Sequence, residues 1–463
     1  MEQNTKGVDT LLGNPKKAII AMSVPLIIAL IAQSANNLID AVWVAGLGPD
    51  ALAAVGFIFP LFFILIGIGN GIGIGASSAI ARHIGRKDKV AVDSTAMQAI
   101  ILTIIGSIVV MTFMLLFQRD LLSAMGAGKT LDLCVEYGTP VFACTIILLL
   151  NGLMSNLLRS EGAARRSMMT QILAAVINII LDPFFIYDYG LGLGMAGAAW
   201  ATIVAVTISF VVIMFWFLIK RDTYIQLSLR YIRLQSETVK DILRVGVPAS
   251  LEMIVMSLFS IVINMIIVMA DQGTDGLAIF SSVWRIIQML MIPVMAVGGA
   301  VVPVFGAAYG ARRFDKIKEA YFYSIKVCVI IMTALVIITE LSADVLVMLY
   351  AYSDSVAGLK DDMAACLRIL CLFLPFMSWG FVGAGLFQSM GMGFYSFICT
   401  IIRNGLQIPA SYILLLLIGT TVSITWGIMS MEALGSVIGG LWSFLLMRSV
   451  IKKAMPAASA EKE

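Results

Sequence analysis

Long apolar stretches, separated by short polar segments, follow one another along almost the whole chain. A transmembrane helix needs about 20 consecutive apolar residues. On this criterion we expect twelve membrane-spanning helices, at residues 17–44, 51–81, 93–117, 133–158, 168–189, 194–219, 238–269, 277–308, 320–350, 363–388, 395–418 and 423–450. The pattern therefore predicts an all-α integral membrane protein.

The composition agrees with this prediction. The chain of 463 residues is 60% hydrophobic and 13% charged, with a mean hydropathy of +0.98. Its net charge of +3 is too small to indicate a nucleic-acid partner. The six cysteines lie in apolar stretches without CxxC spacing, which is typical of small core residues and not of disulfides or metal ligands. The N-terminus has no small-residue cleavage site, so we expect no removable signal peptide.

Basic residues alternate from loop to loop. Outside the spans, one set of loops holds only Arg119, Lys129 and Lys360, while the tails and the other loops hold the remaining Lys and Arg residues. Loops rich in Lys and Arg stay in the cytoplasm. We therefore expect a multi-pass protein of the cell (inner) membrane with both termini cytoplasmic.

The two halves of the chain resemble each other. Pro25 corresponds to Pro248, and Asp50 corresponds to Asp275. Six spans separate the copies, and because six is even, both copies have the same orientation in the membrane. They should be related by a pseudo-twofold axis along the membrane normal, as in transporters with parallel repeats.

This duplication predicts two six-helix lobes. We expect an N-lobe at 1–219 (the first six spans), a cytoplasmic linker at 220–237, and a C-lobe at 238–463. A cleft between two such lobes is where alternating access operates. The repeat therefore favours a transporter.

One face of the first span is polar. Its side chains recur at helical spacing, so they lie together and must face protein, since lipid cannot satisfy them. These residues are Gln33, Asn36, Asn37 and Asp40.

The fifth and sixth spans carry a second polar group. Gln171, Asn178 and Asp182 recur at spacings of seven and four residues, and Thr202 lies in the next span. Intramembrane carboxylates are functional by default, although Asp40 and Asp182 could also be structural polar locks between helices. Asn178 and Thr202 by themselves would be ordinary interhelical hydrogen-bonding groups.

The second lobe has different embedded charges. The positions that correspond to Asp40 and Asp182 in the second repeat are apolar. The charged residues inside its spans that could have a function are Glu252, Arg285 and Arg403. Glu252 lies one turn after Pro248, so it could be either interfacial or functional. Arg403 could be either a structural ion-pair residue or a gate.

Several stretches resemble the multidrug and toxic compound extrusion (MATE) family, and within it the archaeal and DNA-damage-inducible-type branch. They extend over all twelve spans and include "NNLIDAVWVAGLGPDALAAVG", "LLRSEGAARRSMM", "VINIILDPFFI" and "FGAAYGARRFDKIKEA". The resemblance implies that Asp40 and Asp182 are paired acids with Asn178 and Thr202 as oxygen partners. It also implies that Tyr137 and Gln33 line the same cavity and that the first helix bends at Pro25.

These features predict a secondary antiporter and not an enzyme. Two carboxylates in a low-dielectric site cannot easily both be ionised, so a proton is expected there. An all-oxygen set at Asp40, Asn178, Asp182 and Thr202 would equally suit Na+. We expect H+ or Na+ to drive export of amphipathic, often cationic drugs or toxic metabolites past the polar first-span residues, by a monomer without a cofactor. The alternative is a flippase for a lipid-linked saccharide of the same wider superfamily.

Overall fold

The computed structural model describes residues 5–270, 272–348 and 358–460, which are helical with short connections. The first half contains α1 (Lys6–Leu12), α2 (Pro15–Ala45), α3 (Pro49–Arg86), α4 (Lys89–Ala124), α5 (Leu131–Ala143), α6 (Thr145–Ser160), α7 (Ala164–Ile186) and α8 (Gly194–Met214). The second half contains α9 (Ser236–Val268), α10 (Gly273–Leu290), α11 (Ile292–Gly310), α12 (Phe314–Met348), α14 (Lys360–Cys371), α15 (Leu374–Ser389), α16 (Gly393–Gly405), α17 (Gln407–Leu417) and α18 (Thr421–Ala460).

The helices confirm the predicted membrane fold. Among the described residues, ten helical segments are long and apolar enough to cross a membrane, and two bent helix pairs bring the number to twelve. The bent pairs are α5 with α6, at 55°, and α14 with α15, at 45°. The predicted spans 133–158 and 363–388 are thus each two helices.

The predicted span 277–308 is also divided. α10 ends at Leu290, and α11 begins at Ile292 with Pro293 in its first turn. Proline has no backbone N–H to donate to the preceding turn, so it is suited to the start of a new helix.

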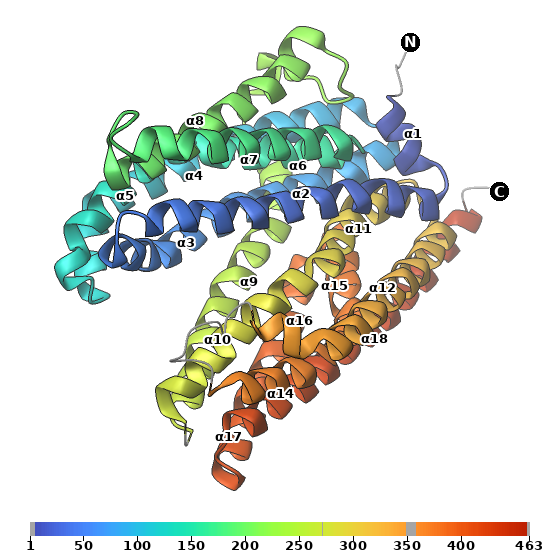
Figure 1. Cartoon of the computed structure of the whole chain (residues 1–463). Coiled ribbons are helices and arrows are strands. Elements are labelled where there is room, and N and C mark those ends of the chain that lie inside the picture. The colour runs from blue at the N-terminus through green and yellow to red at the C-terminus, as the bar shows by residue number, and fades with distance from the viewer. Residues whose placement is uncertain (1–4, 271, 349–357, 461–463) are drawn as a thin grey trace.

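The two halves of the chain form two arms (Figure 1). Helices α2–α8 make one arm, and α9–α18 make the other. The arms meet close to the two chain ends and diverge away from them. Packing between them involves α3 against α9 and α11, and α2 against α11 and α12. The end that carries both termini is therefore the closed end.

Glycines allow α3 and the second arm to approach closely. A methyl group on Gly75 would overlap the carbonyl oxygen of Ile242 and contact the backbone nitrogen of Gly246, both on α9. A methyl group on Gly85 would likewise overlap the backbone of α11 at Ala307. Both glycines lie in the half of α3 that leads to the closed end.

Polar contacts add to this closure. Arg82 is 8% exposed and forms an ion pair with Asp241 on α9, with Nη2 and Oδ1 3.0 Å apart. The hydroxyl of Ser78 donates to the backbone carbonyl of Gln388 at the end of α15. Arg82 also donates through Nε to the carbonyl of Ser78, 3.2 Å away. We call Arg82, Asp241, Ser78 and Gln388 the closed-end latch.

The segment between the halves lies on the first arm. Buried side chains of that arm accept hydrogen bonds from its backbone: Glu161 from Ile225 N–H at 3.0 Å and Asp93 from Gln226 N–H at 2.8 Å. Arg166 donates twice to the Asp222 carboxylate, at 2.8 and 2.7 Å. The connection is therefore packed against the first arm at residues 222–226.

Candidate functional site

The polar residues predicted in the first half lie on α2, α7 and α8, which pack side by side. α2 begins after Asn14, whose side-chain oxygen accepts from the N–H groups of Lys16 and Lys17. The helix then runs without a break through Pro25 to Ala45. α7 contains Pro183 in its last turn and ends at Ile186. These helices bring the polar groups together inside the first arm.

Asn178 is the centre of the cluster. Its side-chain oxygen accepts from Asn36 Nδ2 at 2.9 Å, which connects α7 to α2. Its Nδ2 donates to Asp182 Oδ1 at 2.8 Å and to Thr202 Oγ1 at 3.3 Å. Asn178 is 3% exposed and Asp182 is fully buried. The structure therefore brings Asn36, Asp182 and Thr202 together around Asn178.

Asp40 completes the group beside Asp182. The two carboxyl groups are close enough to interact with each other through charge and hydrogen bonding. Two ionised carboxylates only accept hydrogen bonds, so they cannot bond to each other unless a proton lies between them. A bound cation would relieve their repulsion in the same way.

Three buried oxygens of this cluster have no hydrogen-bond donor among the described residues. They are Asn36 Oδ1, Asp40 Oδ1 and Asp182 Oδ2. A buried acceptor without a partner costs about 1–3 kcal/mol. The cluster has more acceptors than donors, which is the arrangement that a proton or a small cation would satisfy.

The remaining first-half candidates divide into two groups. Tyr137 on α5 lies close enough to Asp40 and Asp182 to interact electrostatically with both carboxyl groups. Gln33 and Asn37 are on α2 but exposed, and no hydrogen bond joins them to another described residue. Their expected place in a substrate cavity stays a prediction.

The second half contains a separate polar cluster. Arg403 on α16 forms an ion pair with Glu432 on α18, with Nε and Oε1 3.2 Å apart, and its guanidinium lies over the Phe381 ring at 5.1 Å. Gln407 donates to Glu432 Oε2 at 2.5 Å. Arg403 is 8% and Glu432 is 4% exposed. Of the two interpretations of Arg403, the structural ion pair is the one these contacts favour.

Sequence reasoning missed Glu432. It lies inside the predicted span 423–450, so a lone acid in the apolar stretch "IMSMEALGS" was an available signal. Glu252 on α9 lies near this cluster, within hydrogen-bonding reach of Ser396 and close enough to Arg403 for their charges to interact. Its Oε1 is buried and has no donor among the described residues. Arg285 is exposed on α10, with no carboxylate partner among the described residues.

Comparison with known proteins identifies relatives over nearly the whole chain. The family model described as MatE matches residues 25–184 and 248–413. The multidrug export protein MepA of Staphylococcus saprophyticus is 26% identical over 441 residues, which cover 95% of this chain and 96% of that protein.

Solved structures agree over the same length. An outward-facing multidrug resistance MATE family transporter of the MOP superfamily superposes with a TM-score of 0.93 at 38% identity, covering 98% of this chain and 100% of that one. A MOP superfamily transporter from Pyrococcus furiosus has the same TM-score and identity and covers 97% of this chain and 100% of that one. It is described with the words "reverse polarity of binding pocket suggests different function". None of these three is described as a saccharide flippase.

Proposed function

Because this chain belongs to the MATE family of transporters, we propose that it exports small amphipathic compounds, many of them cationic, in exchange for H+ or Na+. The relatives that are described as multidrug export proteins support the cargo class. The acid cluster of the first arm supports the coupling. The protein is expected to work as a monomer and without a cofactor.

One observation carries the coupling proposal. Asn36, Asp40 and Asp182 each present a buried oxygen without a donor, at the place where α2 and α7 meet. Burial of a carboxylate without compensation is costly. A cation that binds there removes the cost, so its arrival and departure change the free energy of this helix contact.

Two properties of this cluster suit a cation, the first H+ and the second Na+. The contact between Asp40 and Asp182 suits a shared proton, since one protonated carboxyl group can donate to the other. The amide oxygen of Asn178 and the hydroxyl of Thr202 add neutral oxygens of the kind that Na+ accepts. Thr202 Oγ1 donates to the Ala198 carbonyl at 3.2 Å and accepts from Asn178 Nδ2 at 3.3 Å, so one lone pair of its oxygen stays available.

The movement that follows involves α2. Cation binding changes the charge at Asp40. Pro25 in the same helix leaves the carbonyl of Ala21, four residues earlier, without its helical donor. We propose that α2 bends there during the cycle. If the termini are cytoplasmic, as the basic residues predict, the arms in Figure 1 are open to the outside.

Efflux of a fluorescent cationic dye from proteoliposomes, driven by an imposed H+ or Na+ gradient, tests this function. Asp40→Asn and Asp182→Asn should each lower gradient-driven efflux at least about tenfold, because the neutral amide cannot exchange a cation. Asp132→Asn is a matched control, since Asp132 forms only an exposed ion pair with Arg119.

The control should transport as the wild-type protein does. All variants are first compared by thermal unfolding, so that a loss of fold is not mistaken for a loss of coupling. Full gradient-driven efflux by either Asp40→Asn or Asp182→Asn would show that its carboxylate is not a coupling group.

A further inference from the structure

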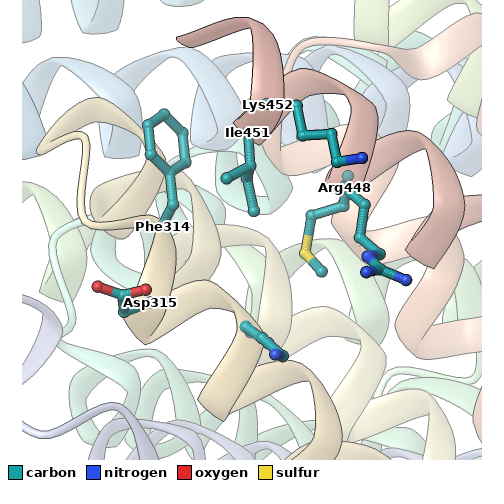
Figure 2. Close-up of a pocket in the computed structure, with 7 residues that line it drawn as sticks. Phe314, Asp315, Arg448, Ile451 and Lys452 are labelled. Carbon is teal, nitrogen blue, oxygen red and sulfur yellow. The ribbon is translucent and has the colours of Figure 1, made fainter. Parts of the chain in front are cut away.

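A cavity of about 190 Å³ lies between the first turns of α12 and the last described turns of α18. In Figure 2, Phe314 and Asp315 of α12 face it from one side, and Arg448, Ile451 and Lys452 of α18 face it from the other. Lys318, one turn further along α12, also lines it. The cavity belongs to neither polar cluster described above.

Its lining has an excess of positive charge. Among the described residues, three cations and one acid line it: Lys318, Arg448, Lys452 and Asp315. In the described part of the chain, none of the three cations has a carboxylate within ion-pair distance, and the Arg448 guanidinium lies over the Phe444 ring, 5.9 Å from its centroid. By contrast, Arg82, Arg166 and Arg403 each have an acidic partner. The three cations of this cavity are therefore exposed and are not neutralised by an ion pair with another described residue.

The position of the cavity along the helices narrows the class of ligand. In α12 and α18 the apolar segments that could cross a membrane are Phe314–Met348 and Thr421–Lys452. The cavity lies where the first begins and the second ends. That level corresponds to the lipid headgroups. Phe314 and Ile451 give the same cavity apolar walls beside its cations. A ligand with an anionic head and an apolar body matches both features.

We propose that this cavity binds the phosphate group of an anionic phospholipid. Lys318, Arg448 and Lys452 contact the headgroup, and the acyl chains lie along the apolar sides of α12 and α18. Solitary basic side chains at helix ends reach the interface simply to stay hydrated. Here three of them converge from two helices on one concave space, which a common anion would explain. The inference is independent of the cation-coupling proposal.

Native mass spectrometry of the full-length protein in detergent tests this site, with titrated phosphatidylglycerol or phosphatidylcholine. The triple variant Lys318→Gln, Arg448→Gln, Lys452→Gln should bind its tightest phosphatidylglycerol roughly a hundredfold more weakly, since each basic side chain near an anionic headgroup strengthens binding several-fold. The matched control is Arg86→Gln, Arg165→Gln, Lys240→Gln, which removes three exposed cations at the same end of the molecule.

The control should bind phosphatidylglycerol as the wild-type protein does. Equal affinities for the triple variant and wild type, or equal losses in the triple variant and the control, would overturn the proposal. The three basic side chains would then be solvated at the interface without forming a lipid site. Binding of millimolar inorganic phosphate with no preference for phosphatidylglycerol over phosphatidylcholine would also overturn it, in favour of a soluble anion.

A second variant makes the charge of the cavity more positive, whereas the triple variant makes it less positive. Asp315→Asn removes the one acid that lines the cavity among the described residues and should raise the affinity for phosphatidylglycerol several-fold. It keeps the test decisive if the triple variant fails to fold. An unchanged or lower affinity would contradict the proposed site.

Discussion

Glu161 is a buried carboxyl group at the end of α6, outside the membrane spans. It is 1% exposed, and burial raises its pKa to about 7, although the N–H of Ile225 and the charge of Arg166 act in the opposite direction. The folded protein therefore holds this proton more tightly than the unfolded chain does. Its contribution favours the folded state below about pH 4.5 and is lost as the pH rises through about 7.

Glu161→Gln should remove this pH dependence. The wild-type protein is expected to lose stability between pH 5 and pH 8, by on the order of 3 kcal/mol at most from this group. The variant should lose less over the same range, as measured by thermal unfolding in detergent. Glu237→Gln, at an exposed position of α9, is the control. An unchanged pH slope in Glu161→Gln would show that this carboxyl group does not titrate there.

For single residues of the first arm, the sequence was most informative about which side chains share a polar helix face. The helical period alone placed Asp40 on the polar face of its span and Asp182 one turn from Asn178, and the structure brings these side chains together. Glu432 shows the limit of this reasoning. Its partner Arg403 lies on another helix, and a pairing between helices depends on packing that periodicity does not describe.

At the scale of helices, the contact of α3 with α9 depends on Gly75. A methyl group there would overlap the backbone of α9, which a side-chain movement cannot relieve. Gly75→Ala should therefore lower the melting temperature, since overpacking costs about 1–3 kcal/mol and exceeds the gain in helix propensity.

Gly56→Ala provides the matched control in the same helix. No atom lies within 4 Å of the methyl group it would add, so only the gain in helix propensity is expected, at most about 1 kcal/mol. If both alanine variants are equally stable in thermal unfolding, the close approach of α3 and α9 is not a constraint.

The number of spans was predictable from hydropathy, but the shape of each span was not. Apolar length is the same for a straight helix and for a bent pair, so the predicted span 133–158 gave no sign of the 55° bend between α5 and α6. That bend is at Cys144, four residues after Pro140. Proline was visible in the sequence, whereas the direction of the bend depends on the neighbouring helices.

At the scale of the whole molecule, the closed-end latch holds the two arms together. Asp241→Asn removes the partner of Arg82. We expect the arms to separate at that end in a larger fraction of molecules, with a shift of about 1 kcal/mol, or roughly fivefold in the population ratio.

Distances between spin labels at Val90 and Phe394 measure this separation, because both side chains are exposed and belong to opposite arms. Asp241→Asn should add a longer distance that the control Asp132→Asn lacks. An unchanged distance distribution would mean that the ion pair does not contribute to closure.

The duplication was visible in the sequence, but the arrangement of the arms was not. Pro25 and Pro248 mark corresponding positions, and the family model begins its two matches at these prolines. Which end of the arms is closed depends on contacts such as that of Gly75 with α9, which join residues about 170 positions apart and leave no periodic signal in the sequence.

We propose that the acid pair Asp40–Asp182 binds and releases the driving cation. The most direct measurement is cation entry into proteoliposomes during dye export, with a pH-sensitive and a Na+-sensitive indicator inside separate preparations. The wild-type protein should show H+ or Na+ influx that starts with dye export, and the Asp40→Asn, Asp182→Asn double variant should show neither. Dye-dependent cation influx that persists in the double variant would contradict the account.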